Sequence, residues 1–135
     1  MNGRFPIALH ILTLLSKSGN GLISSDYIAG SININPALAR KEISNLRNLG
    51  LISSKEGKNG GYILGKSAKQ ITLSDVYQAV KSQPVLGTAK NTPNPDCQIG
   101  KQINKKLDEL YVDLDQTLLK KLGSITIEDF ANKFD

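Results

Sequence analysis

The sequence contains no tryptophan and only one cysteine and one histidine among its 135 residues. Cys97 alone cannot form an intramolecular disulfide, and with His10 it supplies too few ligands for a structural zinc site. We therefore expect neither a disulfide-stapled fold nor a zinc finger, and we assign no metal site.

Long apolar runs are also missing. No stretch approaches the roughly 18 consecutive apolar residues of a membrane span, and residues 1–6 lack the plan of a signal peptide. We expect a cytoplasmic protein without a membrane partner. The sequence shows no paired carboxylates in a constrained motif, no nucleophile with a base and no phosphate-cradling glycine loop that opens a helix. We therefore expect that the protein is not an enzyme.

Positive charge is concentrated in the first half of the chain. Residues 1–70 hold nine Lys and Arg against three Asp and Glu (+6), whereas residues 71–135 hold eight against nine (−1), which together give the net charge of +5. Affinity for duplex DNA comes largely from neutralising phosphates. We predict a DNA-binding domain over 1–70, and a linker helix, a flexible loop and dimerisation helices over 71–135. Charge alone leaves a membrane or an acidic protein open as the partner.

Residues 34–64 predict a basic amphipathic helix followed by a glycine-tipped hairpin. Pro36 suits a first helical turn, and Gly50 suits the left-handed position that ends a helix. Glycines and an asparagine within residues 56–60 suit a tight turn between two short strands. The alternative is a helix and hairpin that merely pack, with solvated lysines. The spacing predicts one packing face, formed by Leu38, Ile43, Leu46 and Leu49, and leaves Arg40, Lys41, Ser44, Arg47 and Asn48 elsewhere.

The segments on either side extend this pattern to a mainly α fold. A largely apolar helix over residues 5–17 is expected at the centre of the core, and Ser24 or Ser25 is a suitable N-cap for a helix that ends near Ile32. Three residues then lead to Pro36, the length expected of a helix-turn-helix. We also predict a helix from the Thr72 cap to Val80, a proline-containing loop over 82–97, a long helix over 98–122 and a short one over 126–134.

The long helix carries one apolar stripe with charged residues between its members. A chain this small has little surface of its own to cover six turns of stripe, so a second copy is the expected partner; packing within one chain is the alternative. The fold class predicted is thus mainly α with a small β-hairpin wing: a winged helix-turn-helix plus a long dimerisation helix. The dimerisation residues expected are Ile99, Ile103, Leu107, Leu110, Leu114 and Leu118.

Four segments of the sequence resemble one known family. Residues 45–54 (Asn-Leu-Arg-Asn-Leu-Gly-Leu-Ile-Ser-Ser) and 57–64 (Gly-Lys-Asn-Gly-Gly-Tyr-Ile-Leu) are similar to the end of the recognition helix and the wing in the Rrf2 (Rrf-two) family of bacterial winged-helix transcription regulators, which includes IscR, NsrR and CymR. Residues 4–12 and 94–101 resemble most its YwnA-like branch. The resemblance spans nearly the whole chain.

This resemblance implies a homodimer that crosses its long helices, places two recognition helices in successive major grooves of double-stranded DNA and extends its wings to the minor groove. Arg40 is the strongest expected base reader, because a guanidinium matches two guanine acceptors. The resemblance further implies that Asn35, Ala37, Arg40, Lys41 and Ser44 face bases or nearby phosphates, that Ser25 and Arg47 hold the DNA backbone, and that Lys55, Lys58, Asn59 and Gly60 belong to the wing contact.

Two positions depart from the family pattern. Glu56 stands where many members carry an arginine, so we expect Lys55 and Lys58 to take over the minor-groove contact. Members that sense through an iron-sulfur cluster use three closely spaced cysteines beyond the wing, whereas this chain has only Cys97 there. We expect no cluster and no other cofactor. Cys97 is either a redox sensor in a polar loop or an incidental thiol.

The function predicted is a sequence-specific, homodimeric DNA-binding transcription regulator, a repressor, that responds to a redox or small-molecule effector. The alternative is an adaptor that uses the winged-helix fold for protein contacts without specific DNA binding, since the fold alone does not impose DNA binding. DNA affinity would fall steeply as the ionic strength rises, whereas an apolar protein contact would not.

Overall fold

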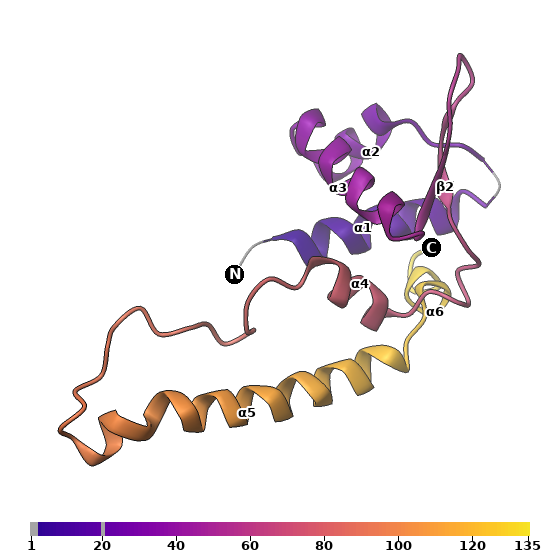
Figure 1. Ribbon diagram of the computed structural model, residues 1–135. Coiled ribbons are helices and arrows are strands. Elements are labelled where there is room, and N and C mark those ends of the chain that lie inside the picture. Colours follow the sequence, from indigo (N-terminus) through magenta and orange to yellow (C-terminus); the bar gives the residue numbers. More distant parts are fainter. Residues whose placement is uncertain (1–2, 20) are drawn as a thin grey trace.

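The computed structural model describes residues 3–19 and 21–135. Figure 1 shows helices with one two-stranded antiparallel hairpin. The elements follow in the order α1 (Arg4–Lys17), α2 (Ser25–Ile32), α3 (Pro36–Asn48), β1 (Ile52–Lys55), β2 (Gly61–Leu64), α4 (Leu73–Val80), α5 (Gln98–Gly123) and α6 (Ile127–Ala131). The predicted order of elements is confirmed, and most boundaries agree within one or two residues.

α1 lies at the centre of the core, as its apolar composition predicts. It contacts α2, α3, α4, α6 and β2. The fully buried side chains of Ile11, Leu12 and Leu15 meet those of the surrounding elements. Each such side chain contributes about 1.5–3 kcal/mol through burial. The core therefore holds α2 and α3 in place from beneath.

Hydroxyl side chains cap the starts of α2, α4 and α6. The hydroxyl of Ser24 accepts a hydrogen bond of 3.1 Å from the backbone N–H of Tyr27, so Ser24 rather than Ser25 is the N-cap of α2. Thr72 and Asp75 form a reciprocal capping box at α4. Thr126 begins α6 in the same way. Such caps stabilise a helix by about 1 kcal/mol each, and they explain why the sequence located these boundaries well.

The C-terminal segment closes back on the core. The N–H of Leu73 donates to the carbonyl of Ile125, and the N–H of Ile127 donates to the carbonyl of Ile71, each at 2.8 Å. Ile71, Leu73 and Ile127 belong to the same apolar cluster as α1. The core thus includes residues from both sides of position 70, and the division of the chain there stays a prediction.

α6 is shorter than the helix expected over 126–134. It ends at Ala131, after which the N–H of Phe134 bonds to the carbonyl of Ala131 in a tighter turn. The rings of Phe130 and Phe134 meet edge to face with centroids 5.5 Å apart, and Lys17 donates to the carbonyl of Phe134. These contacts hold the end of the chain against α1 without a further helical turn.

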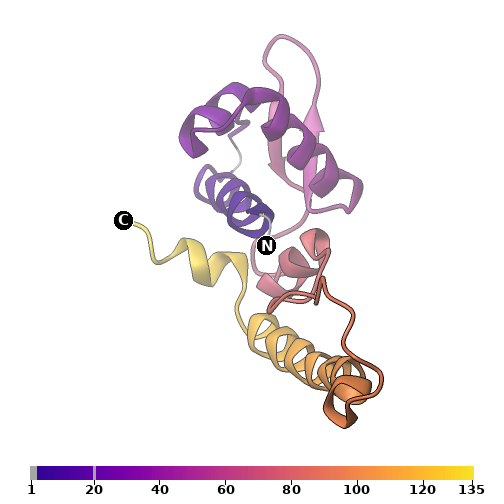
Figure 2. The same ribbon diagram turned by 90° about the vertical axis from the view of Figure 1, so that its left-hand side faces the viewer.

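α5 extends away from the rest of the molecule. Figures 1 and 2 both place it on the far side of α4 and α6 from α2, α3 and the hairpin. Residues 82–97 form neither helix nor strand, as predicted, and lead from α4 to the distant end of α5. None of the residues of α5 is buried, although one side of it packs against α4.

The packing face of α3 differs from the one predicted. Leu38 is 40% exposed and Leu49 is 54% exposed, whereas Ile43 and Leu46 are buried as expected. Five residues advance a helix by about 500°, so Leu38 lies roughly 140° away from Ile43. Leu49 is the C-cap, beyond the last residue of α3. The buried face consists of Ala39, Glu42, Ile43 and Leu46.

Within residues 3–19 and 21–135, no helix is long and apolar enough to cross a membrane.

Candidate nucleic-acid interface

The turn between α2 and α3 depends on one left-handed residue. Asn33 has φ 62°, a conformation that asparagine tolerates better than most residues. The N–H groups of Asn33 and Ile34 both bond to the carbonyl of Ala29, which ends α2 and redirects the chain. α2 and α3 then pack against each other. This is the geometry of a helix-turn-helix.

The first turn of α3 is ordered by its own sequence. The side-chain oxygen of Asn35 accepts a hydrogen bond of 2.7 Å from the N–H of Ala37, and Pro36 occupies the first helical position. Proline costs nothing there, because that N–H has no partner within a helix. Asn35, which the resemblance places near the bases, thus also fixes the start of the helix that carries the other predicted residues.

α3 has two opposite faces with the same spacing. Ala39, Glu42, Ile43 and Leu46 are buried. Four of the residues predicted to contact DNA have the same spacing, but each stands two positions before a buried residue. Two positions turn a helix by about 200°, so these four residues lie on the opposite side. They are Ala37, Arg40, Lys41 and Ser44. Ala37, Arg40 and Lys41 are exposed, and Ser44 is partly buried. The predicted DNA-facing residues therefore share one outward face.

The hairpin lies beside α3 and is tied to it. A guanidinium nitrogen of Arg47 lies 3.4 Å from the hydroxyl of Ser54 in β1 and donates a hydrogen bond to it. Tyr62 in β2 forms a bridge with Ile23, which anchors the hairpin to the segment before α2. Ser25, the first residue of α2, is partly buried. The helix and the hairpin therefore form one surface.

The strands pair in a single register, from Ile52 opposite Leu64 to Lys55 opposite Gly61. The turn between them contains Gly57 at φ 109°. A Cβ atom at Gly60 would collide with the carbonyl oxygen of Lys55, so this position requires glycine. The hairpin itself therefore requires glycine at position 60, independently of any contact with DNA.

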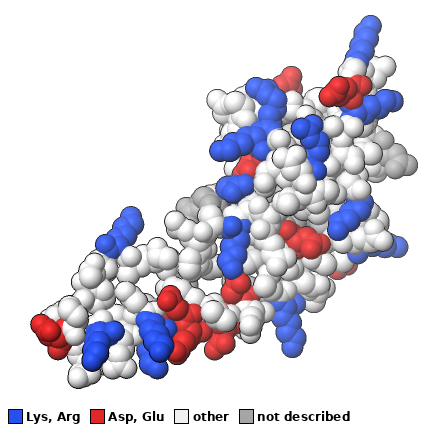
Figure 3. Space-filling view, viewed as in Figure 1, with Lys and Arg blue, Asp and Glu red and all other residues white. Residues whose placement is uncertain are grey.

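Positive charge gathers over this surface. Figure 3 shows mainly lysine and arginine side chains over the part of the molecule that contains α2, α3 and the hairpin, whereas basic and acidic side chains alternate along α5. Lys55, Lys58 and Asn59 are exposed at the end of the hairpin, and so is Glu56. The acidic side chain of Glu56 thus lies in the turn of the hairpin, in sequence between Lys55 and Lys58.

An ion pair between Arg4 and Glu42, on the buried side of α3, was not predicted from the sequence. The guanidinium of Arg4 contacts both carboxylate oxygens of Glu42, at 2.9 Å and 3.2 Å from Nε, and Glu42 is only 2% exposed. The hydrogen bond to Glu42 raises the pKa of Arg4 above its ordinary value, so the guanidinium keeps its charge. A hint was available, since Glu42 falls on the same spacing as Ala39, Ile43 and Leu46.

A second polar cluster joins α4 to α5. Asp115 accepts a hydrogen bond of 2.8 Å from the hydroxyl of Tyr77, and its other oxygen lies 2.7 Å from Nζ of Lys81. Burial, followed by the bond to Asp115, raises the pKa of Tyr77 to about 12. Lys81 and then Tyr77 lower the pKa of Asp115. The cluster fixes one side of α5 against α4.

The predicted dimerisation residues divide into two groups on α5. Ile99, Leu110 and Leu114 are 72%, 48% and 37% exposed. Ile103, Leu107 and Leu118 are partly buried. The apolar arc of α5 is therefore wider than the surface that α4 and the following segment cover.

Cys97 is the N-cap of α5, and its thiol is exposed. Its sulfur accepts a long hydrogen bond of 3.4 Å from the N–H of Gly100. No cluster of three or more His, Cys, Asp and Glu side chains suited to a metal ion occurs in the part of the chain that the structure describes. A single thiol does not match the donor set of an iron-sulfur cluster, which is held by several cysteines.

The sequence of the chain is similar to that of known transcription regulators. Residues 1–133 match the Rrf2 family, described as iron-dependent transcriptional regulator. YwnA of Bacillus subtilis (strain 168), named as a candidate HTH-type transcriptional regulator, is 36% identical over 132 residues, which is 98% of this chain and 97% of YwnA. The HTH-type transcriptional regulator CymR of the same organism is 27% identical over 133 residues, covering 98% of this chain and 88% of CymR.

Solved structures give the same result. The structure of CymR (YrzC), described as the global cysteine regulator of B. subtilis, matches with a TM-score of 0.74 and 27% identity over 100% of this chain and 98% of that one. A crystal structure described as a candidate DNA-binding protein matches with a TM-score of 0.73 and 32% identity over 94% and 97% of the two chains. The family and these relatives are transcription regulators rather than enzymes. This chain therefore belongs to the Rrf2 family and is a DNA-binding transcription regulator with a winged-helix fold.

Proposed function

We propose that this protein represses transcription as a homodimer that inserts α3 into the major groove of a specific operator. The observation that carries the proposal is the outward face of α3, where Arg40 and Lys41 project opposite the buried face. Arg40 reads a base through its two-pronged guanidinium. Because the opposite face is locked in the core, the outward face meets DNA in one fixed orientation.

The residues around α3 supply the contacts that position the protein on DNA. Arg47 lies at the C-terminal end of α3 beside β1, and Lys55 and Lys58 project from the hairpin. Contacts to phosphate carry no sequence information, but they set the register and most of the salt dependence. Ser25 donates its hydroxyl to a phosphate at the start of α2, and the tip of the hairpin, with Asn59 and Gly60, follows the minor groove.

The second copy of the chain covers the exposed arc of α5. Ile99, Leu110 and Leu114 form an apolar row on one face of a helix that buries none of its residues within one chain. Burial of this row against its twin removes apolar area from water on both chains. Two α3 helices on one dimer then meet two half-sites of a palindromic operator.

The signal that releases the protein from DNA acts without an iron-sulfur cluster in this proposal, because one cysteine does not supply the ligands. The signal is either a small molecule or an oxidant. An oxidant would act on Cys97, because its exposed thiol at the start of α5 is accessible to oxidants. Replacing Cys97 by serine then abolishes oxidant-dependent release. Release that persists in Cys97→Ser removes the sensor role and leaves the regulator itself intact.

Fluorescence anisotropy on the duplex upstream of the protein's own coding region tests the proposal. We expect binding at two chains per duplex that persists in excess random duplex and weakens steeply as salt is added. A repressor acts where the chromosome lies, which places it in the bacterial cytoplasm. Binding that random duplex abolishes would contradict sequence-specific recognition of this site. Absence of binding even at low salt would favour the protein adaptor.

A further inference from the structure

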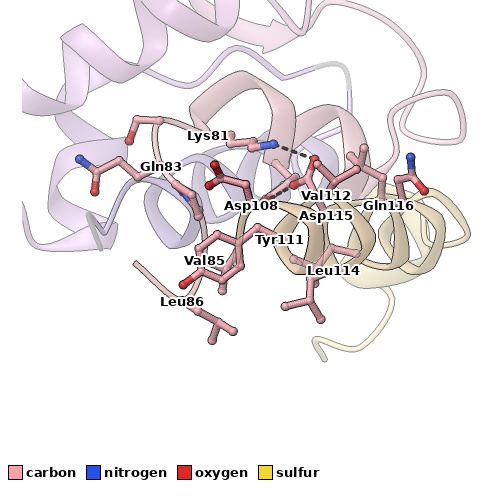
Figure 4. A pocket seen from close by; sticks show the side chains of 15 residues that line it. Lys81, Gln83, Val85, Leu86, Asp108, Tyr111, Val112, Leu114, Asp115 and Gln116 are labelled. Carbon is pink, nitrogen blue, oxygen red and sulfur yellow. Dashed lines mark hydrogen bonds and ion pairs between the residues drawn. The ribbon is translucent and has the colours of Figure 1, made fainter. Parts of the chain in front are cut away.

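Most of the large apolar side chains that stay exposed lie on α5 or on the segment that leads to it. A cavity between α4, residues 82–86 and α5 lies on the same side (Figure 4), and Leu114 lines it. The proposed second copy accounts for this side of the molecule. Leu38 is different, because it is 40% exposed on α3, which Figures 1 and 2 place well away from α5.

Leu38 lies on one flank of the outward face of α3. It stands three positions before Lys41, so the two side chains are about 60° apart around the helix. The buried side chain of Ile43 is about 140° away from it, and Arg40 is about 200° away. Ala37 and Lys41 therefore have Arg40 on one flank and Leu38 on the other.

The rest of this flank is covered by other parts of the chain. The side chain of Asn45, which follows Leu38 by seven positions, donates a hydrogen bond to the carbonyl of Ala79 in α4. The carboxylate of Glu42, one turn after Leu38, is held by Arg4. Seven positions correspond to about 10 Å along a helix. Leu38 thus lies about 10 Å nearer the start of α3 than the contact with α4, where its side chain stays exposed.

The start of α3 is the part that enters the groove in the proposed complex. In a helix-turn-helix, the N-terminal residues of the second helix contact the base edges. Long side chains on a helix lean toward its N-terminus, which directs Leu38 over the first turn. Pro36 and the cap Asn35 order that turn. A docked α3 therefore brings Leu38 against base edges in a fixed position.

A leucine side chain recognises only one feature of the major groove. It has no hydrogen-bond donor or acceptor for a base or a phosphate. The base edges in this groove present donors and acceptors, and thymine also presents a methyl group at C5. Leucine against a polar edge would displace water and leave the edge without a partner, which costs free energy. Leucine against the thymine methyl group buries apolar surface on both sides.

We propose that Leu38 reads a thymine of the operator through its C5 methyl group, on the flank of α3 opposite to Arg40. This rests on the proposed function, because it requires α3 in the major groove. Arg40 recognises a base by hydrogen bonds, whereas Leu38 does so by apolar contact. The contact with thymine releases no counterions, so its contribution is the same at low and at high salt.

Removal of single methyl groups from the DNA tests this role. Selection from a pool of random duplexes first supplies the sequence that the full chain binds. Each thymine in it is then replaced by deoxyuridine, which keeps the O4 acceptor and lacks the methyl group. We expect one thymine in each half-site at which this change weakens wild-type binding about threefold to fourfold, as measured by anisotropy. Replacement in both half-sites should weaken binding about tenfold.

The variant Leu38→Ala should lose this response. A double-mutant cycle compares wild type and variant on the thymine and uracil duplexes, and we expect the variant to distinguish them less than about 1.5-fold. Leu49→Ala is the matched control, because it removes the same side chain from a leucine that is 54% exposed at the other end of α3. This control should keep the full response to uracil. Alanine favours a helix at least as well as leucine, so α3 is retained in the Leu38 variant.

The outcomes separate this role from the function on which it rests. If the wild type binds a selected sequence but no thymine responds to uracil, Leu38 does not read thymine, and the sequence-specific regulator stands. The same conclusion follows if the response persists in Leu38→Ala or disappears equally in Leu49→Ala. If selection yields no preferred sequence, sequence-specific recognition fails and the role of Leu38 fails with it.

Discussion

The side-chain amide of Asn45 in α3 donates a hydrogen bond of 3.2 Å to the backbone carbonyl of Ala79 in α4. On its other side, α4 holds α5 through Tyr77 and Lys81, which both contact Asp115. One short helix of eight residues, α4, thus contacts both α3, the proposed recognition helix, and α5, the proposed dimer helix. A movement of α5 has a direct path of packed and hydrogen-bonded groups to α3.

Replacing Arg40 by alanine should weaken binding to the cognate operator by about 1–3 kcal/mol and relax the preference at one base position, because a bidentate base contact is lost. Lys58→Ala is the comparison: a phosphate contact carries no sequence information, so binding should weaken evenly across sequences and the salt slope should fall by about 1. Anisotropy titrations on cognate and mutated duplexes measure both. If Arg40→Ala weakens all duplexes equally, Arg40 is not a base reader.

Replacing Leu110 by aspartate should dissociate the proposed homodimer, because it places a charge in the middle of the apolar row on α5. Val112→Asp introduces the same charge two positions later, on a side chain that is 57% exposed and points to another side of the helix. This control should remain dimeric. Light scattering coupled to size-exclusion chromatography gives the mass of each, and a dimeric Leu110→Asp variant would place the interface elsewhere.

Replacing Arg4 by methionine should lower the free energy of unfolding by about 1–3 kcal/mol, because the Glu42 carboxylate stays buried without its partner. The double variant Arg4→Met, Glu42→Met should recover most of the loss, since no buried charge remains. Urea unfolding of the wild type, both single variants and the double variant measures the coupling. A double variant as unstable as the sum of the singles would show that the pair does not act as a unit.

The Tyr77–Asp115 contact should make stability depend on pH at both extremes. Folding raises the pKa of Tyr77 from 10.0 to about 12, so its contribution is complete below pH 10 and is lost as the pH rises through 12. Folding lowers the pKa of Asp115, so its contribution is present above the ordinary carboxyl pKa and is lost as the pH falls.

A spectrophotometric titration of tyrosinate resolves Tyr77 as the step that Tyr77→Phe removes. In Asp115→Asn this step should move part of the way back toward 10.0, because burial, the larger cause of the shift, remains. The acid-side loss of stability should shrink in the same variant. An unmoved Tyr77 step would mean that the bond to Asp115 does not form in solution.

The sequence predicted the elements of this fold well where short-range chemistry sets them. Pro36, Gly50 and the capping residue Thr72 mark helix boundaries through interactions with neighbours a few positions away. The outward position of Arg40 and Lys41 follows from helical periodicity. These features depend on little beyond their own turn of the chain.

Features that depend on distant residues were not predicted. Arg4 and Glu42 are 38 positions apart, and a glutamate inside a basic helix gives no indication of the residue it will meet. Tyr77 and Asp115 are separated by the same interval. The cavity beside α5 forms only when α4, residues 82–86 and α5 are brought together. Their relative positions come from packing, which a local pattern does not encode.

The antiparallel bridge between Thr72 and Thr126 brings together the points at which the chain leaves and rejoins the core around α5. The segment between them, which contains α4, residues 82–97 and α5, therefore begins and ends at neighbouring points of the core. The length of α5 can change by whole turns, about 5.4 Å each, without a break in the central packing. A change of length in this part of the chain would accordingly leave the core intact, while it would alter the spacing of half-sites that the proposed dimer accepts.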